Sequence, residues 1–214
     1  MIFADRAHAG ERLGEALRER LGSSNAVVLA IPRGGVIVGE AAAAAMGVPL
    51  DVVVPRKIGA PGNPELAIGA IAPGIRVLDR RMVVGLGVSD AYLDHEIVAQ
   101  EAEIDRRQHA YRQGRPPQPV EGRVAIVVDD GVATGSTAIA ALRWVRQQGA
   151  ERVVLAVPVA PPQSLERLQA EADDVVVLET PSPFFAVGEW YRDFDQTSDR
   201  QVVDALARSA GTRA

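Results

Sequence analysis

Short apolar runs recur along the chain, and most are followed by a turn and then by a segment with helical periodicity. Runs of this length without polar alternation are typical of strands buried on both faces of a parallel sheet. Strands that alternate with helices form such a sheet with helices packed on both sides. The pattern therefore predicts a three-layer α/β/α fold with a central, mostly parallel sheet. The predicted strands cover residues 26–31, 50–54, 124–128, 152–157 and 175–178.

Amphipathic spacing places helices between these strands. A first helix is predicted over residues 5–22, because Leu13, Leu17 and Leu21 fall on one face. A long polar helix, inserted before the central strand, is predicted over residues 89–114, and its thin apolar stripe could contact another helix. The stripe consists of Leu93, Ile97, Ile104 and Tyr111. Further helices are predicted over residues 36–46, 164–172 and 198–207, and from about residue 136.

A stretch rich in glycine and proline, residues 58–66, follows the basic pair Arg56 and Lys57. This composition favours a mobile loop over a regular element. A mobile loop behind two cations could close over a diphosphate and exclude water. Beyond it, residues 67–71 and 75–78 are predicted to form a hairpin joined by a Pro-Gly turn.

The central strand, residues 124–128, runs directly into the acidic pair Asp129 and Asp130 and then into a turn and a helix. The free N–H groups and positive dipole of a helix N-terminus suit a phosphate. The carboxylates can hold ribose hydroxyls or a hydrated Mg²⁺ beside it. A sugar phosphate is one ligand that would use both halves. The turn comprises Gly131, Val132, Ala133, Thr134, Gly135, Ser136 and Thr137.

The stretch from Val127 to Thr137 resembles the phosphoribosyl-pyrophosphate (PRPP) motif of the type I phosphoribosyltransferases. The alternative is an ordinary strand-to-helix turn with an acidic strand end. The resemblance implies the fold of that family over about residues 26–178. It also implies Mg²⁺-dependent transfer of 5-phosphoribose to a nitrogen acceptor, with Asp129 and Asp130 as catalytic residues that contact the metal through water or ribose hydroxyls.

One departure concerns the acceptor. Members that act on 6-oxopurines usually carry an aspartate where this chain has Ala133, which weakens an assignment to hypoxanthine or guanine. The acceptor class favoured by the resemblance is a nucleobase, but the sequence does not name it.

A second glycine turn, residues 32–35, follows the first core strand and carries a cation. Such a turn can wrap N–H groups around a diphosphate, and the resemblance places a pyrophosphate-binding loop here. Lys57 is the catalytic candidate for contact with the diphosphate, and Glu65 is a candidate proton donor to a base. The alternative for these cations is a solvent-facing role. The candidate diphosphate contacts are Arg33, Gly34, Gly35 and Arg56.

Five of the nine aromatic residues lie between positions 184 and 194, where the strand–helix alternation has ended. An aromatic cap over a sugar-phosphate site could stack a nucleobase, and the resemblance implies a variable hood for the acceptor, here at about residues 179–195. The alternative is the core of a C-terminal flap or a dimer contact. The candidate acceptor contacts are Phe184, Phe185, Trp190 and Tyr191.

Composition limits the remaining possibilities. The net charge is −5 and no basic block is present, so nucleic-acid binding is not indicated. There is no cysteine, no apolar run of membrane-spanning length and no signal-peptide pattern. We therefore expect one cytoplasmic domain over residues 1–214, without a membrane partner. A homo-oligomer is left open.

Two other functions are compatible with the central motif. A regulator could bind PRPP or a nucleotide without turning it over, because such a protein can retain the same motif. A phosphoribosyl hydrolase or phosphorylase is a weaker third possibility. The leading hypothesis is a transferase that uses PRPP, a small-molecule acceptor and Mg²⁺, and releases pyrophosphate.

Overall fold

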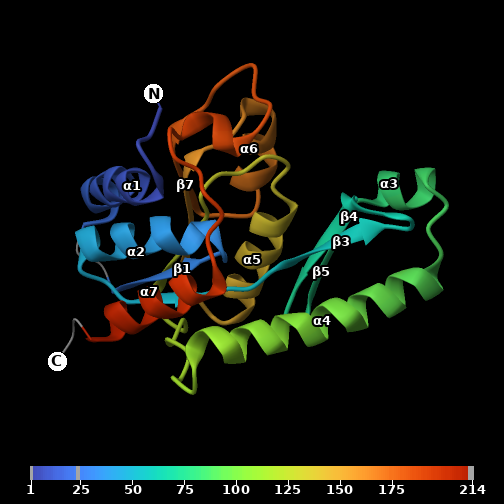
Figure 1. Ribbon diagram of the computed structural model, residues 1–214, viewed down its shortest axis with the longest axis horizontal. Helices are drawn as coiled ribbons and strands as arrows, with labels where there is room; N and C mark the ends of the chain where they lie inside the picture. The colour runs from blue at the N-terminus through green and yellow to red at the C-terminus, as the bar shows by residue number, and fades with distance from the viewer. Residues whose placement is uncertain (1, 23–24, 212–214) are drawn as a thin grey trace.

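A computed structural model describes residues 2–22 and 25–211 and shows a five-stranded parallel sheet between two layers of helices (Figure 1). The strand order is β2-β1-β6-β7-β8, and every neighbouring pair is parallel. This confirms the predicted fold class. The strands are β1 (Ala26–Ala30), β2 (Leu50–Val52), β6 (Val124–Val128), β7 (Arg152–Val159) and β8 (Asp174–Glu179).

Alternate residues of the central strands pack against opposite helix layers. Val28, Ile126 and Val154 belong to the core shared with α1, α2 and α7. Their neighbours Val27 and Val127 belong to the core shared with α5 and α6. Burial on both faces explains why these strands are continuous apolar runs. The helices are α1 (Arg6–Leu21), α2 (Gly34–Met46), α5 (Ser136–Gln147), α6 (Pro162–Gln169) and α7 (Asp199–Gly211).

A smaller antiparallel sheet and two helices project from one side of the main sheet (Figure 1). The small sheet packs against α5, and the long helix α4 returns along it towards α7. The predicted apolar stripe of α4 is buried at all four positions, which confirms that prediction. The elements are β3 (Arg56–Ala60), β4 (Asn63–Ala72), β5 (Ile75–Leu78), α3 (Arg80–Gly85) and α4 (Asp90–Arg112).

The prediction of a loop over residues 58–66 was wrong, because this stretch forms β3 and the start of β4. Ile58 is fully buried, and the backbone at Gly59 lies so close to Pro64 that an added Cβ would be 2.6 Å from its Cα. Gly62 turns the chain with a φ of +74°. The glycines and prolines of this stretch therefore form a tight, irregular hairpin. Pairing between β3 and β4 determines its structure more than its local composition does.

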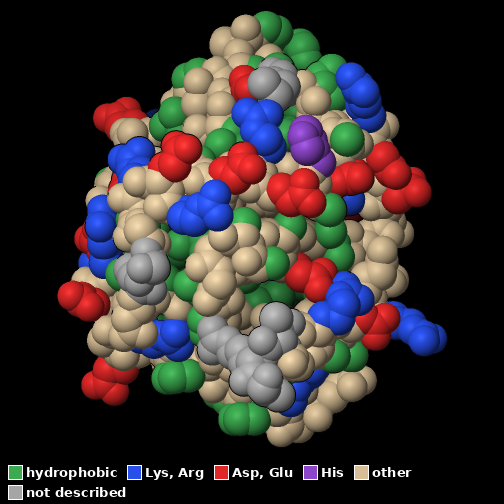
Figure 2. Space-filling model, turned by 90° about the vertical axis from the view of Figure 1, so that its left-hand side faces the viewer, with side chains coloured by type: hydrophobic (Ala, Val, Ile, Leu, Met, Phe, Trp, Pro, Cys, Tyr) green, Lys and Arg blue, Asp and Glu red, His purple; other side chains and the backbone are tan. Residues whose placement is uncertain are grey.

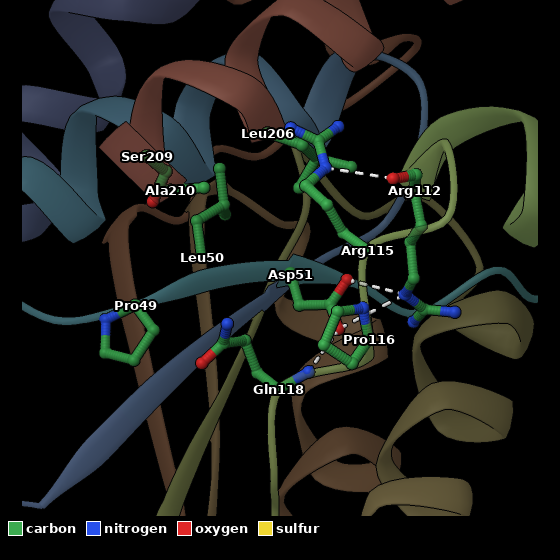
Figure 3. A pocket seen from close by; sticks show the side chains of 10 residues that line it. All are labelled: Pro49, Leu50, Asp51, Arg112, Arg115, Pro116, Gln118, Leu206, Ser209 and Ala210. Atoms are coloured by element: carbon green, nitrogen blue, oxygen red, sulfur yellow. Dashed lines mark hydrogen bonds and ion pairs between the residues drawn. The ribbon is translucent and has the colours of Figure 1, made fainter. Parts of the chain in front are cut away.

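The C-terminal end of α4 is anchored to the edge strand β2 through the buried Asp51 (Figure 3). Arg112 donates from Nε to Asp51 Oδ1 at 2.9 Å, and the Gln118 N–H donates to Asp51 Oδ2 at 2.8 Å. The Asp51 carboxylate also accepts the Val52 N–H. These bonds satisfy the buried charge and fix the direction in which α4 leaves the main sheet.

On the face in Figure 2, acidic and basic side chains are interspersed and no basic area dominates. Within residues 2–22 and 25–211, no helix combines the length and apolar character that a membrane crossing needs.

Candidate active site

A cavity of about 550 Å³ opens at the carboxyl ends of β1, β2 and β6. This is the edge at which parallel α/β sheets bind ligands. Most predicted site residues meet here, although they come from three separate strand ends. Gly35, Ser136 and the four candidate aromatic residues do not line the cavity. The predicted residues that do are Arg33, Gly34, Arg56, Lys57, Glu65, Asp129, Asp130, Gly131, Val132, Ala133, Thr134, Gly135 and Thr137.

The turn between β6 and α5 is held from its outer side. The Val132 N–H donates to the Val159 carbonyl at 2.9 Å, and the Ser164 hydroxyl donates to the Ala133 carbonyl. Gly135 is the N-cap of α5, with a φ of +85°, and supplies no side chain to the helix N–H groups. Those N–H groups stand beside the cavity with the Thr134 and Thr137 side chains, an arrangement suited to a phosphate.

The acidic pair lies at the end of β6. Asp129 Oδ1 accepts the Asp130 N–H at 2.9 Å. Burial, followed by the charge of Asp130, raises the pKa of Asp129 well above its usual value. Asp130 Oδ2 instead accepts from Arg6 Nε at 2.8 Å, and its backbone carbonyl accepts the Tyr191 hydroxyl. The two carboxylates are therefore adjacent in sequence but differ in environment.

Arg6 is a site residue that the sequence did not reveal. It stands in the first turn of α1, and its side chain is only 12% exposed. A cation in the first turn of a helix is unfavourable, because the helix N-terminus carries a partial positive charge. This placement is the one local feature of the sequence that distinguishes Arg6. Without knowledge of which segments meet in space, the residue cannot be linked to an aspartate more than a hundred positions away.

The second glycine turn packs directly against the acidic pair. A Cβ at Gly34 would lie 1.9 Å from Asp130 Oδ2, and a Cβ at Gly35 would lie 2.9 Å from the Asp129 Cα. The Pro32–Arg33 peptide in this turn is cis. Glycine is therefore required at both positions because the two turns touch. Gly34 lines the cavity, whereas Gly35 lies behind it.

The basic side of the cavity is organised by α4. Arg56 donates from Nε to Gln100 Oε1 at 2.8 Å, and Gln100 donates from Nε2 to Glu96 Oε1 at 2.8 Å. Burial, followed by the charge of Arg107, lowers the pKa of Arg56. Glu96 and Gln100 both line the cavity. No sequence pattern distinguishes them from the other polar residues of this helix.

The candidate aromatic side chains of the C-terminal segment do not line the cavity. Phe185 is 78% exposed, whereas Tyr191 is buried and its ring lies tilted against those of Phe3 and Phe194, at centroid distances of 5.5 and 5.0 Å. Phe184 and Trp190 are partly buried. Only Val187 reaches the cavity from this segment. The described structure thus places Tyr191 in the core of a C-terminal flap, as the alternative interpretation has it.

The sequence pattern of the phosphoribosyl transferase domain matches residues 4–192. The chain belongs to this family. The match includes the glycine turn, the acidic pair and the phosphate turn. It also reaches Arg6 and most of the C-terminal segment, both of which lie outside the core that the sequence motif indicated.

Relatives of this phosphoribosyl transferase domain cover nearly all of the chain. A Mycobacterium tuberculosis protein that is provisionally named a phosphoribosyl transferase is 47% identical over 209 residues, which are 97% of this chain and 47% of the relative. The chain thus spans about half the length of the curated relatives it matches. A Thermus thermophilus protein, TT1426, has a crystal structure with 46% identity and a TM-score of 0.82, covering 97% of this chain and 99% of that one.

A uracil phosphoribosyltransferase from Staphylococcus saprophyticus is similar over a shorter segment. The two chains are 39% identical over 62 residues, which are 29% of this chain and 30% of the relative. This similarity covers only part of the domain.

The donor groups of this phosphoribosyl transferase domain fit Mg²⁺ in one particular way. Among the described residues, no cluster of three or more histidine or acidic side chains could form a metal site of protein ligands alone. Mg²⁺ commonly binds through one or two carboxylates together with waters and substrate phosphates. Asp129 and Asp130 provide two carboxylates at the cavity, so the site suits an ion bound together with a phosphorylated substrate.

Proposed function

We propose that this domain transfers 5-phosphoribose from PRPP to a nitrogen acceptor and releases pyrophosphate. The observation that carries the proposal is the convergence of three parts on one cavity: the phosphate turn, the acidic pair and the basic side. PRPP has a terminal phosphate, a ribose with two free hydroxyls and a diphosphate. Each part of the cavity suits one of these groups.

The proposed binding mode follows from that correspondence. The 5-phosphate accepts N–H and hydroxyl bonds from the turn at residues 133–137, where Ser136 begins α5. The ribose hydroxyls donate to Asp129 and Asp130, and the diphosphate contacts Arg33, Arg56 and Lys57. Because these groups approach from different strand ends, they hold the donor in one orientation before reaction.

In the reaction, the bond between ribose C1 and the diphosphate oxygen breaks as the nitrogen lone pair of the acceptor bonds to C1. Positive charge develops on the ribose and negative charge on the leaving diphosphate. Asp129 and Asp130 stabilise the first, while Lys57 and Arg33 stabilise the second. Mg²⁺, when bound, supplies further positive charge to the diphosphate. Glu65 lines the cavity from β4 and is the proposed group for proton transfer with the acceptor.

We propose a nucleobase as the acceptor. The support is the segment shared with a uracil phosphoribosyltransferase. Ala133 leaves no carboxylate at the position that 6-oxopurine members use, so a pyrimidine or an adenine-type base is favoured over hypoxanthine or guanine.

A pyrophosphate-release assay tests the proposal. The protein is incubated with PRPP and Mg²⁺ and with a panel of nucleobases and small amines, one at a time. We expect pyrophosphate release that depends on one acceptor class. Release without any acceptor would indicate a hydrolase. PRPP binding without release under every condition would indicate a regulator and contradict the transferase.

A further inference from the structure

The C-terminal aromatic segment pairs with the residues that precede α1. The Phe3 N–H donates to the Trp190 carbonyl at 2.8 Å, and the Arg192 N–H donates to the Phe3 carbonyl at 2.8 Å. The Asp193 N–H donates to the Ala4 carbonyl at 3.0 Å. This short ladder fixes the chain just before α1 begins. It therefore fixes the side on which the first turn of α1 projects Arg6.

The same segment encloses the Arg6 guanidinium. Its Nη1 donates to the Asp195 carbonyl at 2.7 Å, and its Cζ lies 3.8 Å from the centroid of the Phe194 ring. A guanidinium over an aromatic face gains a cation–π attraction, which strengthens as water is excluded. With the side chain only 12% exposed, Arg6 is held in one orientation by groups that lie outside the cavity.

In that orientation Arg6 reaches the acidic pair. Its Nε donates to Asp130 Oδ2 at 2.8 Å, while the Tyr191 hydroxyl holds the Asp130 carbonyl. The ion pair rests on the backbone of Gly34, where an added Cβ would lie 2.7 Å from Arg6 Nε. Asp130 is thus fixed at both its side chain and its backbone by the C-terminal segment and α1.

We propose that Arg6 is a positioning residue, held by the C-terminal segment, that orients Asp130 towards the ribose hydroxyls and offsets one of the two charges of the acidic pair. The inference rests on the proposed function. With Oδ2 bound to Arg6, the Asp130 carboxylate is held at the cavity that Asp130 lines. Without Arg6, repulsion from Asp129 would turn the carboxylate, and the acidic pair would lose the cation that offsets its negative charge.

The test measures PRPP binding by calorimetry over a series of Mg²⁺ concentrations. Arg6→Met removes the charge and the donors but keeps a long apolar side chain. We expect PRPP affinity at saturating Mg²⁺ to fall about tenfold, the scale of a lost charge-assisted hydrogen bond. The Mg²⁺ concentration for half-maximal PRPP binding should also fall, because the uncompensated pair attracts the cation more strongly.

Arg18→Met is the matched control, because Arg18 lies on α1 with its side chain exposed and does not line the cavity. Wild-type affinity and Mg²⁺ dependence in Arg6→Met would overturn the inference, as would an equal loss in Arg18→Met. If Arg6→Met does not fold, Arg6→Lys decides. Lysine keeps the positive charge but lacks the planar guanidinium. Wild-type PRPP affinity in Arg6→Lys would overturn the positioning role of Arg6. A loss of PRPP affinity with unchanged Mg²⁺ dependence would support that role.

The outcomes separate this inference from the proposed function. An unaltered protein that binds no PRPP would refute the proposed function, and this inference with it. If the unaltered protein and Arg6→Met bind PRPP with equal affinity, only the role of Arg6 is refuted and the proposed function stands.

Discussion

At the scale of single residues, Asp129 occupies an environment that disfavours its charge. Burial is the main reason that its pKa is raised, and the negative charge of Asp130 raises it further. The positive charge of Lys57 lowers it. Arg6 is bound to Asp130 rather than to Asp129. The environment of Asp129 therefore disfavours a negative charge at the position where the proposed substrate and its cation would bind.

Replacing Asp129 by Asn should stabilise the ligand-free protein near neutral pH. The folded pKa lies above the unfolded value of about 3.9, so ionisation disfavours folding once the pH rises past that value. Asn keeps an oxygen that can accept the Asp130 N–H. We expect a gain of about 1 kcal/mol, seen as a melting temperature about 2–4 °C higher at roughly pH 7, and little change at about pH 3. A lower melting temperature at neutral pH would contradict this.

Replacing Gly34 by Ala should disrupt the contact between the two turns. The new methyl group would lie 1.9 Å from Asp130 Oδ2, so the turn or the carboxylate must move. We expect a loss of about 1–3 kcal/mol in unfolding free energy, measured by urea denaturation, together with weaker PRPP binding. Gly85→Ala is the control, because a Cβ there meets nothing within 4 Å. Equal stability of the two variants would show that the turns do not touch.

At the scale of elements, α4 brings polar side chains to a cavity that is otherwise built from strand ends. Its C-terminal end is tied to β2 through Asp51, and its middle supplies the Gln100 that holds Arg56. The helix therefore sets the direction of a cation on the proposed diphosphate side. Helices inserted before the central strand can in this way influence a site without belonging to the motif.

Gln100→Leu should weaken binding of inorganic pyrophosphate, used as a probe of the diphosphate side. Leucine keeps the volume but cannot accept from Arg56, so the guanidinium loses its orientation. We expect a three- to tenfold loss of affinity in calorimetry, about the value of one hydrogen bond to a charged group. Gln108→Leu on the same helix does not face the cavity and should bind normally. Unchanged pyrophosphate affinity in Gln100→Leu would show that α4 does not orient Arg56 for binding.

Much of the element order could be predicted because its signals are local. Buried strands are continuous apolar runs, and the acidic pair and phosphate turn are adjacent in the sequence. The hairpin at residues 58–66 was missed because glycine and proline serve tight hairpins as well as loops. Arg6 and Gln100 were missed because their roles depend on partners far away in the chain.

At the scale of the whole molecule, the residues before α1 meet the segment that precedes α7 beside the cavity. The residues before α1 pair with residues 190–193, and the ring of Phe194 lies against the Arg6 guanidinium. Of the five aromatic residues outside the strand–helix pattern, this packing involves Tyr191 and Phe194. The sequence could locate the cluster but could not show that its packing partner is Phe3, near the N-terminus. The fold thus holds Asp130 between the first turn of α1 and the segment that precedes α7.

The central claim is that the acidic pair binds PRPP, and calorimetry with PRPP and Mg²⁺ tests it most directly. The variant Asp129→Asn with Asp130→Asn is compared with the unaltered protein, and melting curves confirm that both are folded. We predict that the double variant loses about a hundredfold in PRPP affinity, the scale of removing key electrostatic contacts. A folded double variant that binds PRPP with unaltered affinity would contradict the account and return Asp129 and Asp130 to a structural role.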